Sequence, residues 1–548
     1  MTGASWLRRA AVLADRRRWW IVALCIAGQW AFLGHEVRGA VSHNGWLFAD
    51  GDDGPWYWTT AWAQTTLHVP ITAVGAGWPY LLTPLAAIFG PNMADGLPSV
   101  VALNVLVLGP ASVVGMFLLA ERIGGRLFAV WTAVLWTLMP LLAISLYSST
   151  HRTYITDFFL PTGTGLNALA DYPSTVFAIF CAYLVLRALD SNSLRDGLLC
   201  GVLLGFLALM KPANGPLPLA AVVVLAVMFR FRALAGTVVA AVPAAFALWI
   251  WKGLGTGTVP VLAGGGGSGG GASTVANNVH KYVNIDFQHL AQNLHDLREV
   301  FWSLRLLEFL LVAGAVGLIA RARWKGIFVV GWFVAFALIK GTVSYSNVYD
   351  ASLYRFLLPA WPAWTLIVAG VVFCWPVGTA VRARQRALDL ARAGASRVVD
   401  RRIVAGAALV LALGPLLVIV ADSPAKPGAI IDENYTGAPV PVADFGIHVH
   451  QTGAHSVRFT WNAIGTKRAA TTYVIFKDAT NGCGPMDPVH PLCRFKMQFI
   501  GSTHSTEFVD AQAVTRRFYR VGLAIGATIQ VDYQSFLLMS KPVAFAPR

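Results

Sequence analysis

The chain reads Trp46-Leu-Phe-Ala-Asp50-Gly-Asp52-Asp53-Gly-Pro-Trp-Tyr57-Trp58 directly after its first apolar segment. Three carboxylates therefore stand among aromatic side chains where the chain is expected to leave a bilayer. Asp and Gly are common turn residues, and Gly54-Pro55 interrupts regular structure, so a solvated turn is one explanation. The other is a site in which a carboxylate accepts a proton from a substrate or binds a metal ion. The surrounding sequence decides between the two.

The composition is that of a polytopic membrane protein. Of the 548 residues, 56% are hydrophobic and only 13% are charged, and the mean hydropathy is +0.59. Soluble domains do not combine these values. A net charge of +15 is also found in nucleic-acid-binding proteins, but here the basic residues lie in short clusters between apolar segments. We therefore expect membrane lipids, and no nucleic acid, as partners.

Eleven apolar segments are long enough, at about 17 to 25 residues, to cross a bilayer as helices. They are centred near Cys25, Val107, Leu135, Ile179, Leu204, Val223, Val242, Val312, Phe333, Val368 and Leu411. The first follows five arginines and lacks a small-residue cleavage site, which predicts a retained span and no cleavable signal peptide. The sequence thus predicts an all-α transmembrane domain of about eleven helices over residues 1–422.

Half of the 42 Lys and Arg residues fall into short connections on one side of these segments, such as residues 382–402. Such an excess marks the cytoplasmic side, so we expect a multi-pass protein of the cell membrane with a cytoplasmic N-terminus. The outward loop at about residues 34–97 is too long for a simple connector and should fold on the membrane surface. Its tryptophans, among them Trp58 and Trp78, are expected mainly as anchors at headgroup depth.

Ionisable residues recur at the outward ends of the predicted spans. They are His151 and Arg152 before span four, Asp171 at the entrance to span four, Lys211 at the end of span five and Arg355 at the start of span ten. Each has an ordinary explanation: Asp171 suits a helix N-terminus, and Lys211 suits a lysine that reaches the lipid surface. Their position on one face nevertheless favours a site, because ionisable groups at membrane depth are costly and usually functional.

Carboxylates and cations at a lipid interface suit glycosyl transfer from a polyprenyl-phosphate sugar. There a carboxylate deprotonates the acceptor hydroxyl, while cations stabilise the departing lipid phosphate. Two other classes stay open. A transporter or flippase of lipid-linked sugars would line its path with the same charges, although the sequence has no internal repeat. A membrane-anchored binding protein would need fewer spans.

From about residue 423 the sequence changes to short β-favouring segments separated by Gly, Asn and Pro. These segments are Ser456–Trp461, Thr472–Phe476, Phe495–Ile500, Phe518–Leu523 and Phe536–Met539. They predict a small extracytoplasmic β-sandwich over residues 423–548, and Trp461 with Phe518-Tyr519-Arg520-Val521 resembles the fibronectin type III pattern. Cys483 and Cys493, ten residues apart, are expected to form a disulfide in this oxidising compartment.

The membrane motifs resemble the GT-C superfamily of polytopic glycosyltransferases, especially the protein O-mannosyltransferases and lipid A aminoarabinose transferases. That branch has an acidic pair soon after span one, an Asp-x-Pro at a span entrance, a Lys ending a Gly-rich span and a late Arg-Tyr-Leu-Leu-Pro-like signature. The matching stretches are Gly51-Asp52-Asp53-Gly54-Pro-Trp-Tyr57, Asp171-Tyr172-Pro173, Gly205 to Lys211-Pro212 and Arg355-Phe356-Leu357-Leu358-Pro359. The resemblance covers roughly residues 17–375. The pair here is Asp-Asp where Asp-Glu is commoner, and the fibronectin-like tail is not shared.

The resemblance implies a GT-C-like fold and an inverting transferase with a polyprenyl-phosphate sugar as donor and a glycan, lipid or protein as acceptor. Asp53 or Asp52 would be the general base, Asp171 a supporting acid, and Lys211 and Arg355 the contacts to the donor phosphate. Further candidates are His151 and Arg152 for the phosphate, and Asp50 and Tyr57 for the site. Metal use varies in such enzymes, so Mg²⁺ or Mn²⁺ held by Asp52 and Asp171 is one expectation. No other cofactor is implied.

Overall fold

The computed structural model describes the following residues: 13–42, 54–65, 75–90, 93–146, 160–256, 286–300, 304–343, 346–348, 352–374, 406, 409–414, 417, 430–432, 442–463, 471–478, 493–495, 498–511, 513, 517–525, 536–541 and 543–545. Asp50, Asp52, Asp53, His151 and Arg152 lie outside them. So do Cys483 and the side chain of Cys493. What the sequence predicts for these residues stays a prediction.

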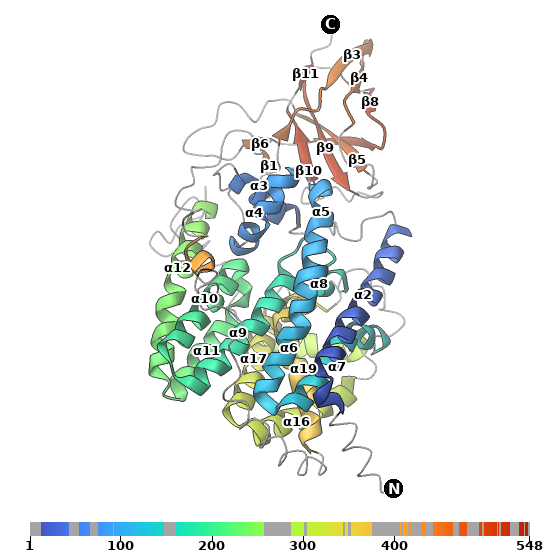
Figure 1. The fold of residues 1–548 in the computed structure, drawn as a ribbon. Helices are drawn as coiled ribbons and strands as arrows, with labels where there is room; N and C mark the ends of the chain where they lie inside the picture. Colours follow the sequence, from blue (N-terminus) through green and yellow to red (C-terminus); the bar gives the residue numbers. More distant parts are fainter. Residues whose placement is uncertain are drawn as a thin grey trace.

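Helices make up the described part as far as Cys374 (Figure 1). They are α2 (Arg18–Ser42), α3 (Gly54–Thr65), α4 (Gly77–Phe89), α5 (Met93–Ala102), η1 (Leu103–Leu108), α6 (Gly109–Gly124), α7 (Arg126–Leu146), α8 (Leu160–Thr164), α9 (Asp171–Ser191), α10 (Leu194–Met210), η4 (Pro212–Asn214), α11 (Pro216–Val227), α12 (Phe231–Thr256), α15 (Phe287–Val300), α16 (Leu304–Ala322), α17 (Trp324–Gly341), α18 (Ser352–Leu357), η5 (Leu358–Ala360), α19 (Trp361–Ala369) and η6 (Gly370–Cys374).

Five of the described helical stretches are long and apolar enough to cross a membrane. They are Gly96–Gly124, Asp171–Ser191, Phe231–Trp251, Trp324–Gly341 and Ser352–Cys374. Shorter apolar helices occur at Gly77–Phe89, Arg126–Pro140, Pro212–Val227 and Phe309–Ala322. The chain therefore has the polytopic helical character that its composition predicts, while the count of eleven spans stays a prediction.

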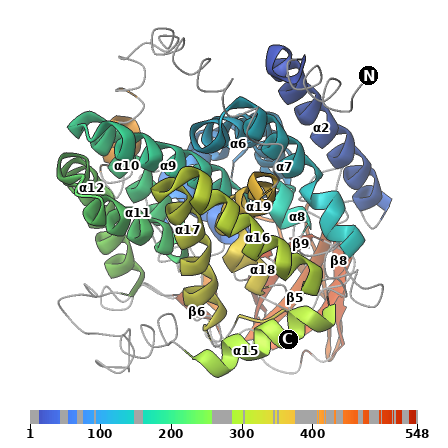
Figure 2. The ribbon, with the colours of Figure 1, turned by 90° about the horizontal axis from the view of Figure 1, so that it is seen from below.

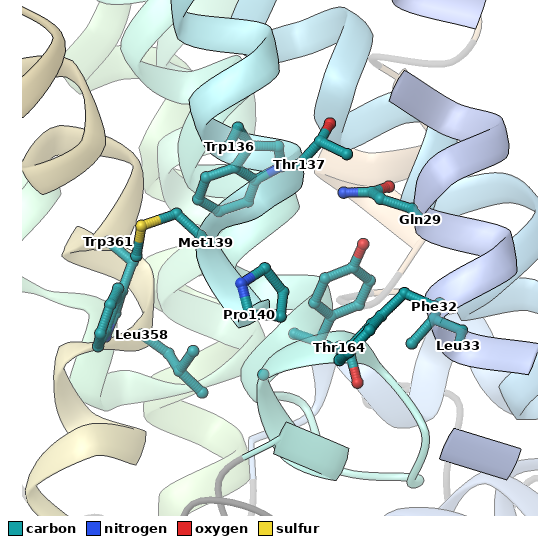
Figure 3. Close-up of a pocket in the computed structure, with 12 residues that line it drawn as sticks. Gln29, Phe32, Leu33, Trp136, Thr137, Met139, Pro140, Thr164, Leu358 and Trp361 are labelled. Atoms are coloured by element: carbon teal, nitrogen blue, oxygen red, sulfur yellow. The ribbon is translucent and has the colours of Figure 1, made fainter. Parts of the chain in front are cut away.

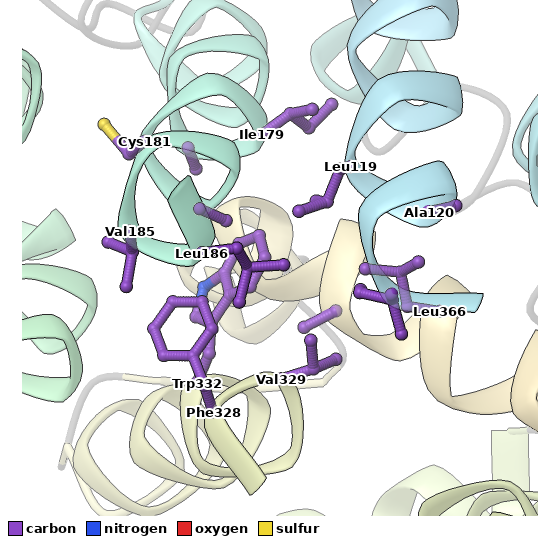
Figure 4. Close-up of a cluster of buried hydrophobic side chains, with 14 of the residues drawn as sticks. Leu119, Ala120, Ile179, Cys181, Val185, Leu186, Phe328, Val329, Trp332 and Leu366 are labelled. Carbon is purple, nitrogen blue, oxygen red and sulfur yellow. The ribbon is translucent and has the colours of Figure 1, made fainter. Parts of the chain in front are cut away.

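The main hydrophobic core lies where α6, α9, α17 and α19 meet. Figure 4 shows Leu119, Ile179, Leu186, Trp332 and Leu366 converging there from these four helices. All five side chains are buried, and van der Waals packing of this kind holds helices together in a membrane. Seen along the bundle, α9 lies between the pair α10 and α12 on one side and α6 and α7 on the other (Figure 2). Both ends of α9 are thereby held in place.

Helices α10 and α12 lie in close contact because glycines recur every four residues along α10. A Cβ at Gly197 would overlap the carbonyl oxygen of Ala233, and a Cβ at Gly201 would overlap that of Thr237. Thr237 donates its hydroxyl to the Gly197 carbonyl at 3.2 Å across this interface. Small residues that let two backbones approach in this way are typical of helix pairs in membranes. These glycines set the position of α10, and therefore that of Lys211, the residue that follows α10.

A second apolar cluster lies at the end of the bundle nearest the strands, under α3 and α4. Trp58 and Trp78 are fully buried in it, and their indole N–H groups donate to the carbonyls of Gly90 at 3.2 Å and Ala168 at 2.8 Å. The expectation that these two tryptophans anchor the loop at headgroup depth is therefore wrong. The indole ring packs among apolar side chains and its N–H group donates to a backbone carbonyl, so both its apolar and its polar part find partners inside the protein.

The C-terminal part consists of β-strands at the end of the molecule opposite the N-terminus (Figure 1). The strands are β1 (Ile430–Asp432), β2 (Val442–Ala443), β3 (His448–Gly453), β4 (Ser456–Thr460), β5 (Thr471–Asp478), β6 (Cys493–Phe495), β7 (Gln498–Thr503), β8 (Glu507–Asp510), β9 (Arg517–Ile525), β10 (Phe536–Ser540) and β11 (Val543–Phe545). One sheet has the order β2-β10-β9-β5-β7 with β11 beside β9, a second has the order β3-β4-β8, and β1 pairs with β6.

The two larger sheets contribute to one core. Phe459 from β4 and Tyr519 from β9 stack with ring centroids 4.4 Å apart, and Trp461 meets Tyr473 of β5 edge to face at 5.3 Å. Tyr473 and Ile475 are both buried, as the period of two in a strand requires. All five predicted β segments thus coincide with strands or parts of strands. The β-sandwich and its fibronectin type III likeness stay predictions.

Candidate functional site

Asp171 is the first residue of α9 and is 1% exposed. Its carboxylate does not cap the helix, because Ala170 occupies the N-cap position without a side-chain bond. The two oxygens instead bind two cations: Lys211 Nζ lies 2.5 Å from Oδ1, and Arg355 Nη2 lies 3.4 Å from Oδ2. We call these three residues the Asp171 cluster. An acid at a helix N-terminus is also favoured by the helix dipole.

Lys211 reaches Asp171 because of the residue that follows it. Pro212 disfavours a helical conformation at the preceding position, and Lys211 takes φ −152° and ψ 111°, which ends α10. The turn is held by Asn214, whose side-chain amide donates to the Leu207 carbonyl and to the Ser174 hydroxyl, both at 3.0 Å. The Ser174 bond ties this turn directly to the first turn of α9. Lys211 therefore pairs with an anion at its own depth and is only 13% exposed.

Arg355 lies on α18, next to Phe356, whose ring brings a further cation into the site. Lys211 Nζ lies 5.8 Å from the centroid of that ring, and Lys340 Nζ lies 5.9 Å from it. Lys340 is the penultimate residue of α17 and is 5% exposed. Three cationic side chains from three separate helical segments thus gather around one carboxylate and one aromatic ring.

The segment leading into α9 is fixed by hydrogen bonds to buried side chains. Asn104 donates its amide to the carbonyls of Gly165 at 3.0 Å and Asn167 at 3.1 Å. Trp78 donates to Ala168, as described above. These bonds satisfy backbone groups that would otherwise be buried without partners. Asp171 therefore follows a segment whose course is set by η1 and α4 as well as by α9 itself.

A cavity of about 70 Å³ lies between α2, α7, α8 and the start of α19 (Figure 3). Its lining includes Tyr172, the neighbour of Asp171, and Leu358, which follows Arg355 by three positions. Most of the remaining lining is apolar, and the sticks in Figure 3 show Phe32, Met139 and Trp361 facing it from three helices. The charged cluster and this largely hydrophobic space thus share sequence neighbours, Tyr172 and Leu358.

Helix α15 is hydrogen-bonded to the end of α17 that carries Lys340. Asn293, 2% exposed, donates to the Gly341 carbonyl at 3.0 Å and to the Ser346 hydroxyl at 3.1 Å. His289 Nε2 lies 2.7 Å from the Ser346 carbonyl. Figure 2, which looks along the bundle, shows α15 running crosswise at its edge. These bonds hold the chain that follows Lys340 in place.

The structure brings together three of the residues singled out by sequence: Asp171, Lys211 and Arg355. Tyr57, a further candidate, is 2% exposed and belongs to the second apolar cluster, not to the Asp171 cluster. Lys340 was missed by the sequence reasoning, although a signal existed. Like Lys211, it ends an apolar run on the side predicted to face outward.

A metal ion at Asp171 finds little support among the described residues. Both carboxylate oxygens are engaged by cations, which compete with a metal. The one group of three potential ligands in the described part is His295, Asp296 and Glu299 on α15, and Asp171 is not in it. A metal held by Asp171 would therefore depend on Asp52, which lies outside the described residues.

No protein-family model and no curated protein sequence matches the chain. Among solved structures, the archaeal oligosaccharyltransferase AglB from Archaeoglobus fulgidus, in complex with an inhibitory peptide and a dolichol-phosphate, aligns with 13% identity and a TM-score of 0.39 over 74% of this chain and 56% of its own. Arabinosyltransferase EmbB from Mycobacterium smegmatis aligns with 12% identity and a TM-score of 0.36 over 96% of this chain and 64% of its own. The chain thus spans between half and two thirds of the length of these structures.

Proposed function

We propose that this chain is a GT-C-like membrane glycosyltransferase that moves a sugar from a polyprenyl-phosphate donor to an acceptor hydroxyl at the outer face of the membrane, with inversion. The observation that carries the proposal is the buried Asp171, shared by Lys211 and Arg355 at the ends of apolar helices. Removing such charges from water costs several kcal/mol per ion, and stability alone does not repay it. Ionisable groups at this depth are usually retained for function.

The cations suit the leaving group of this reaction. When the bond between the sugar and the phosphate breaks, negative charge develops on the phosphate oxygen, and fixed cations in a water-poor site stabilise that charge strongly. Asp171 orients Lys211 and Arg355, and its two oxygens are both occupied in doing so. Its part in the proposal is therefore to position the two cations, while another carboxylate takes the proton.

Asp53, or Asp52 beside it, is the proposed general base. Four residues further on, Tyr57 belongs to the same buried cluster as Ala170 and Met210, the neighbours of Asp171 and Lys211. The proposal places Asp53, four positions before Tyr57, close to this cluster. A base needs hydrogen-bond reach of the acceptor hydroxyl, and the acidic pair is the proposed source of that base.

The cavity described above suits the lipid part of the donor. Its lining is mostly apolar, and two of its members, Tyr172 and Leu358, follow closely after Asp171 and Arg355 in the chain. A polyprenyl phosphate has the same division into a charged head and a hydrocarbon chain. The proposal therefore places the phosphate at the cations and the first isoprenoid unit in the cavity.

The test is to incubate the purified, membrane-reconstituted protein with a panel of radiolabelled polyprenyl-phosphate sugars and to measure sugar release or transfer. We expect turnover of at least one donor, and loss of turnover in Asp53→Asn with membrane insertion intact, because the change keeps the size but removes the base. Full activity in both Asp53→Asn and Asp52→Asn would end the proposal for the acidic pair. Movement of donors across the membrane without any transfer would identify a flippase instead.

A further inference from the structure

Lys340 is a buried cation that the proposed reaction has not yet used. It lies at the end of an apolar helix and is 5% exposed, and no carboxylate among the described residues pairs with it. Its ammonium shares the face of Phe356 with Lys211. A ring face attracts a cation, but by only about 0.5–2 kcal/mol, which is well below the several kcal/mol that burying an ammonium costs.

A structural lysine on the same helix looks different. Lys325, in the first turn of α17, is 26% exposed and has its own anion, with Nζ 2.9 Å from Asp190 Oδ1. Lys340, near the other end of α17, has neither that exposure nor that partner. An isolated buried ammonium is costly, and an anion supplied from outside the chain would stabilise its charged form.

The charges around Lys340 indicate what kind of anion this is. The described cluster contains three cations, Lys211, Lys340 and Arg355, and one carboxylate, Asp171. Lys211 and Arg355 already share the carboxylate's charge, whereas Lys340 does not. Among the described residues, positive charge is therefore in excess, and it is concentrated at Lys340, beside Lys211 and over Phe356.

We propose that Lys340 binds the additional negative charge of the phosphate monoester released from the donor, so that the site prefers a polyprenyl phosphate carrying two charges over the singly charged donor. This inference rests on the proposed function and deepens it. In the reaction the acceptor oxygen forms a bond to the anomeric carbon, and its proton passes to the base. The bond from that carbon to the phosphate oxygen breaks, and its electron pair leaves with the phosphate. A diester with one negative charge thus becomes a monoester with two.

Lys340 contributes little to binding of the donor in the ground state, because Lys211 and Arg355 meet the single charge of the diester. Its attraction grows as the second charge develops. Removing it therefore lowers kcat more than it raises KM, since an interaction strengthened only in the transition state acts on kcat. Lys211 differs because it also holds Asp171, so its removal disturbs donor binding as well.

The test compares binding of a polyprenyl phosphate, which carries two charges, with binding of its methyl ester of the same chain length, a phosphate diester that carries one. The full-length protein is placed in lipid nanodiscs, and both ligands are titrated by tryptophan fluorescence. We expect the wild type to bind the monoester more tightly, and Lys340→Met to lower that preference about tenfold, or about 1.4 kcal/mol. Lys340→Arg, which keeps the charge, should retain most of the preference. Lys325→Met, at the other end of the same helix, should leave it unchanged.

An unchanged preference in Lys340→Met would overturn the inference, and so would an equal loss of affinity for the monoester and its methyl ester, which indicates a packing role. If Lys340→Met does not fold, a lowered preference in Lys340→Gln decides the matter in the same way. The binding assay needs no catalysis. If the preference depends on Lys340 but the protein shows no transferase activity, the anion site stands and the proposed function fails. If the protein is active but the preference does not depend on Lys340, the proposed function stands and the role of Lys340 fails.

Discussion

Helix α9 carries an aspartate near each end, and each aspartate meets one lysine and one arginine. At one end Asp171 pairs with Lys211 and Arg355. At the other, Asp190 pairs with Arg122 at 2.8 Å and Lys325 at 2.9 Å. The side chain of Asp190 is 40% exposed, whereas that of Asp171 is 1% exposed. The same set of charges therefore stands in water at one end of the bundle and inside the protein at the other.

The difference separates structure from proposed function. Exposed ion pairs contribute about 0–1 kcal/mol each, and Asp190 serves to join α6, α9 and α17 at a surface already rich in basic residues. A buried pair costs more to form, and removing one of its partners lowers the stability of the protein far more. The buried end also holds Lys340, a buried cation that pairs with no carboxylate among the described residues. The proposed ligand site is therefore at the Asp171 end.

The largest contrast is expected between Asp171→Asn and Asp190→Asn. Losing the Asp171 charge leaves Lys211 and Arg355 buried together, which should lower the free energy of unfolding by about 3–5 kcal/mol and abolish transfer. Asp190→Asn should cost less than about 1 kcal/mol and leave transfer intact. Thermal unfolding in detergent and the donor assay measure both. Equal losses in the two variants would break the comparison.

The next effect concerns Lys211→Ala, with Lys325→Ala as the matched change at the other end. Lys211 is proposed to contact the donor phosphate, so its loss should weaken the interaction with the donor more than that with the acceptor, and lower kcat/KM by about a hundredfold. Lys325→Ala should change neither the interaction with the donor nor kcat/KM. Steady-state kinetics with each substrate varied in turn gives the answer. Equal effects on donor and acceptor would make Lys211 a purely structural residue.

A smaller effect is expected from Gly201→Ala, which tests whether close contact of α10 with α12 positions the Asp171 end. The new Cβ would overlap the Thr237 carbonyl, and such overpacking costs roughly 1–3 kcal/mol. Gly331 on α17 has no atom within 4 Å of the same position, so Gly331→Ala should be neutral or stabilising. Melting temperatures compare the two. A Gly201→Ala protein as stable as the wild type would show that α10 and α12 can move apart without loss of stability.

The smallest effect sharpens the role of α15. Asn293→Ala removes two hydrogen bonds that hold the chain after Lys340, at a cost of about 1–2 kcal/mol. Gln292→Ala, one residue earlier, removes a part-buried bond to Asp296 that lies within the same helix and does not reach the chain after Lys340. Hydrogen exchange of the amides at Thr342 and Val343 should quicken in the first variant and stay unchanged in the second. Identical exchange rates in the two variants would show that α15 does not hold the chain after Lys340.

Much of the site was predictable because its residues stand at the ends of apolar segments. Asp171, Lys211 and Arg355 were singled out from their positions at the outward ends of predicted spans, and the structure brings them together. The tryptophans were misjudged, since an aromatic residue in an outward loop packs equally well at a lipid surface and in a core. Only the packing of α3 and α4 against Ala168 and Met210 decides which. The acidic stretch around Asp53 stays a prediction.

Composition and spacing by themselves determined that the chain forms apolar helices followed by strands, and which ionisable residues stand at helix ends, because these properties depend on neighbours in sequence. Only the tertiary structure decided which of those residues meet. Lys211 is 40 positions from Asp171, and Arg355 is 184 positions from it. Contacts across such separations depend on how closely and at what angle helices pack, which is set by features such as the glycines that seat α10 on α12.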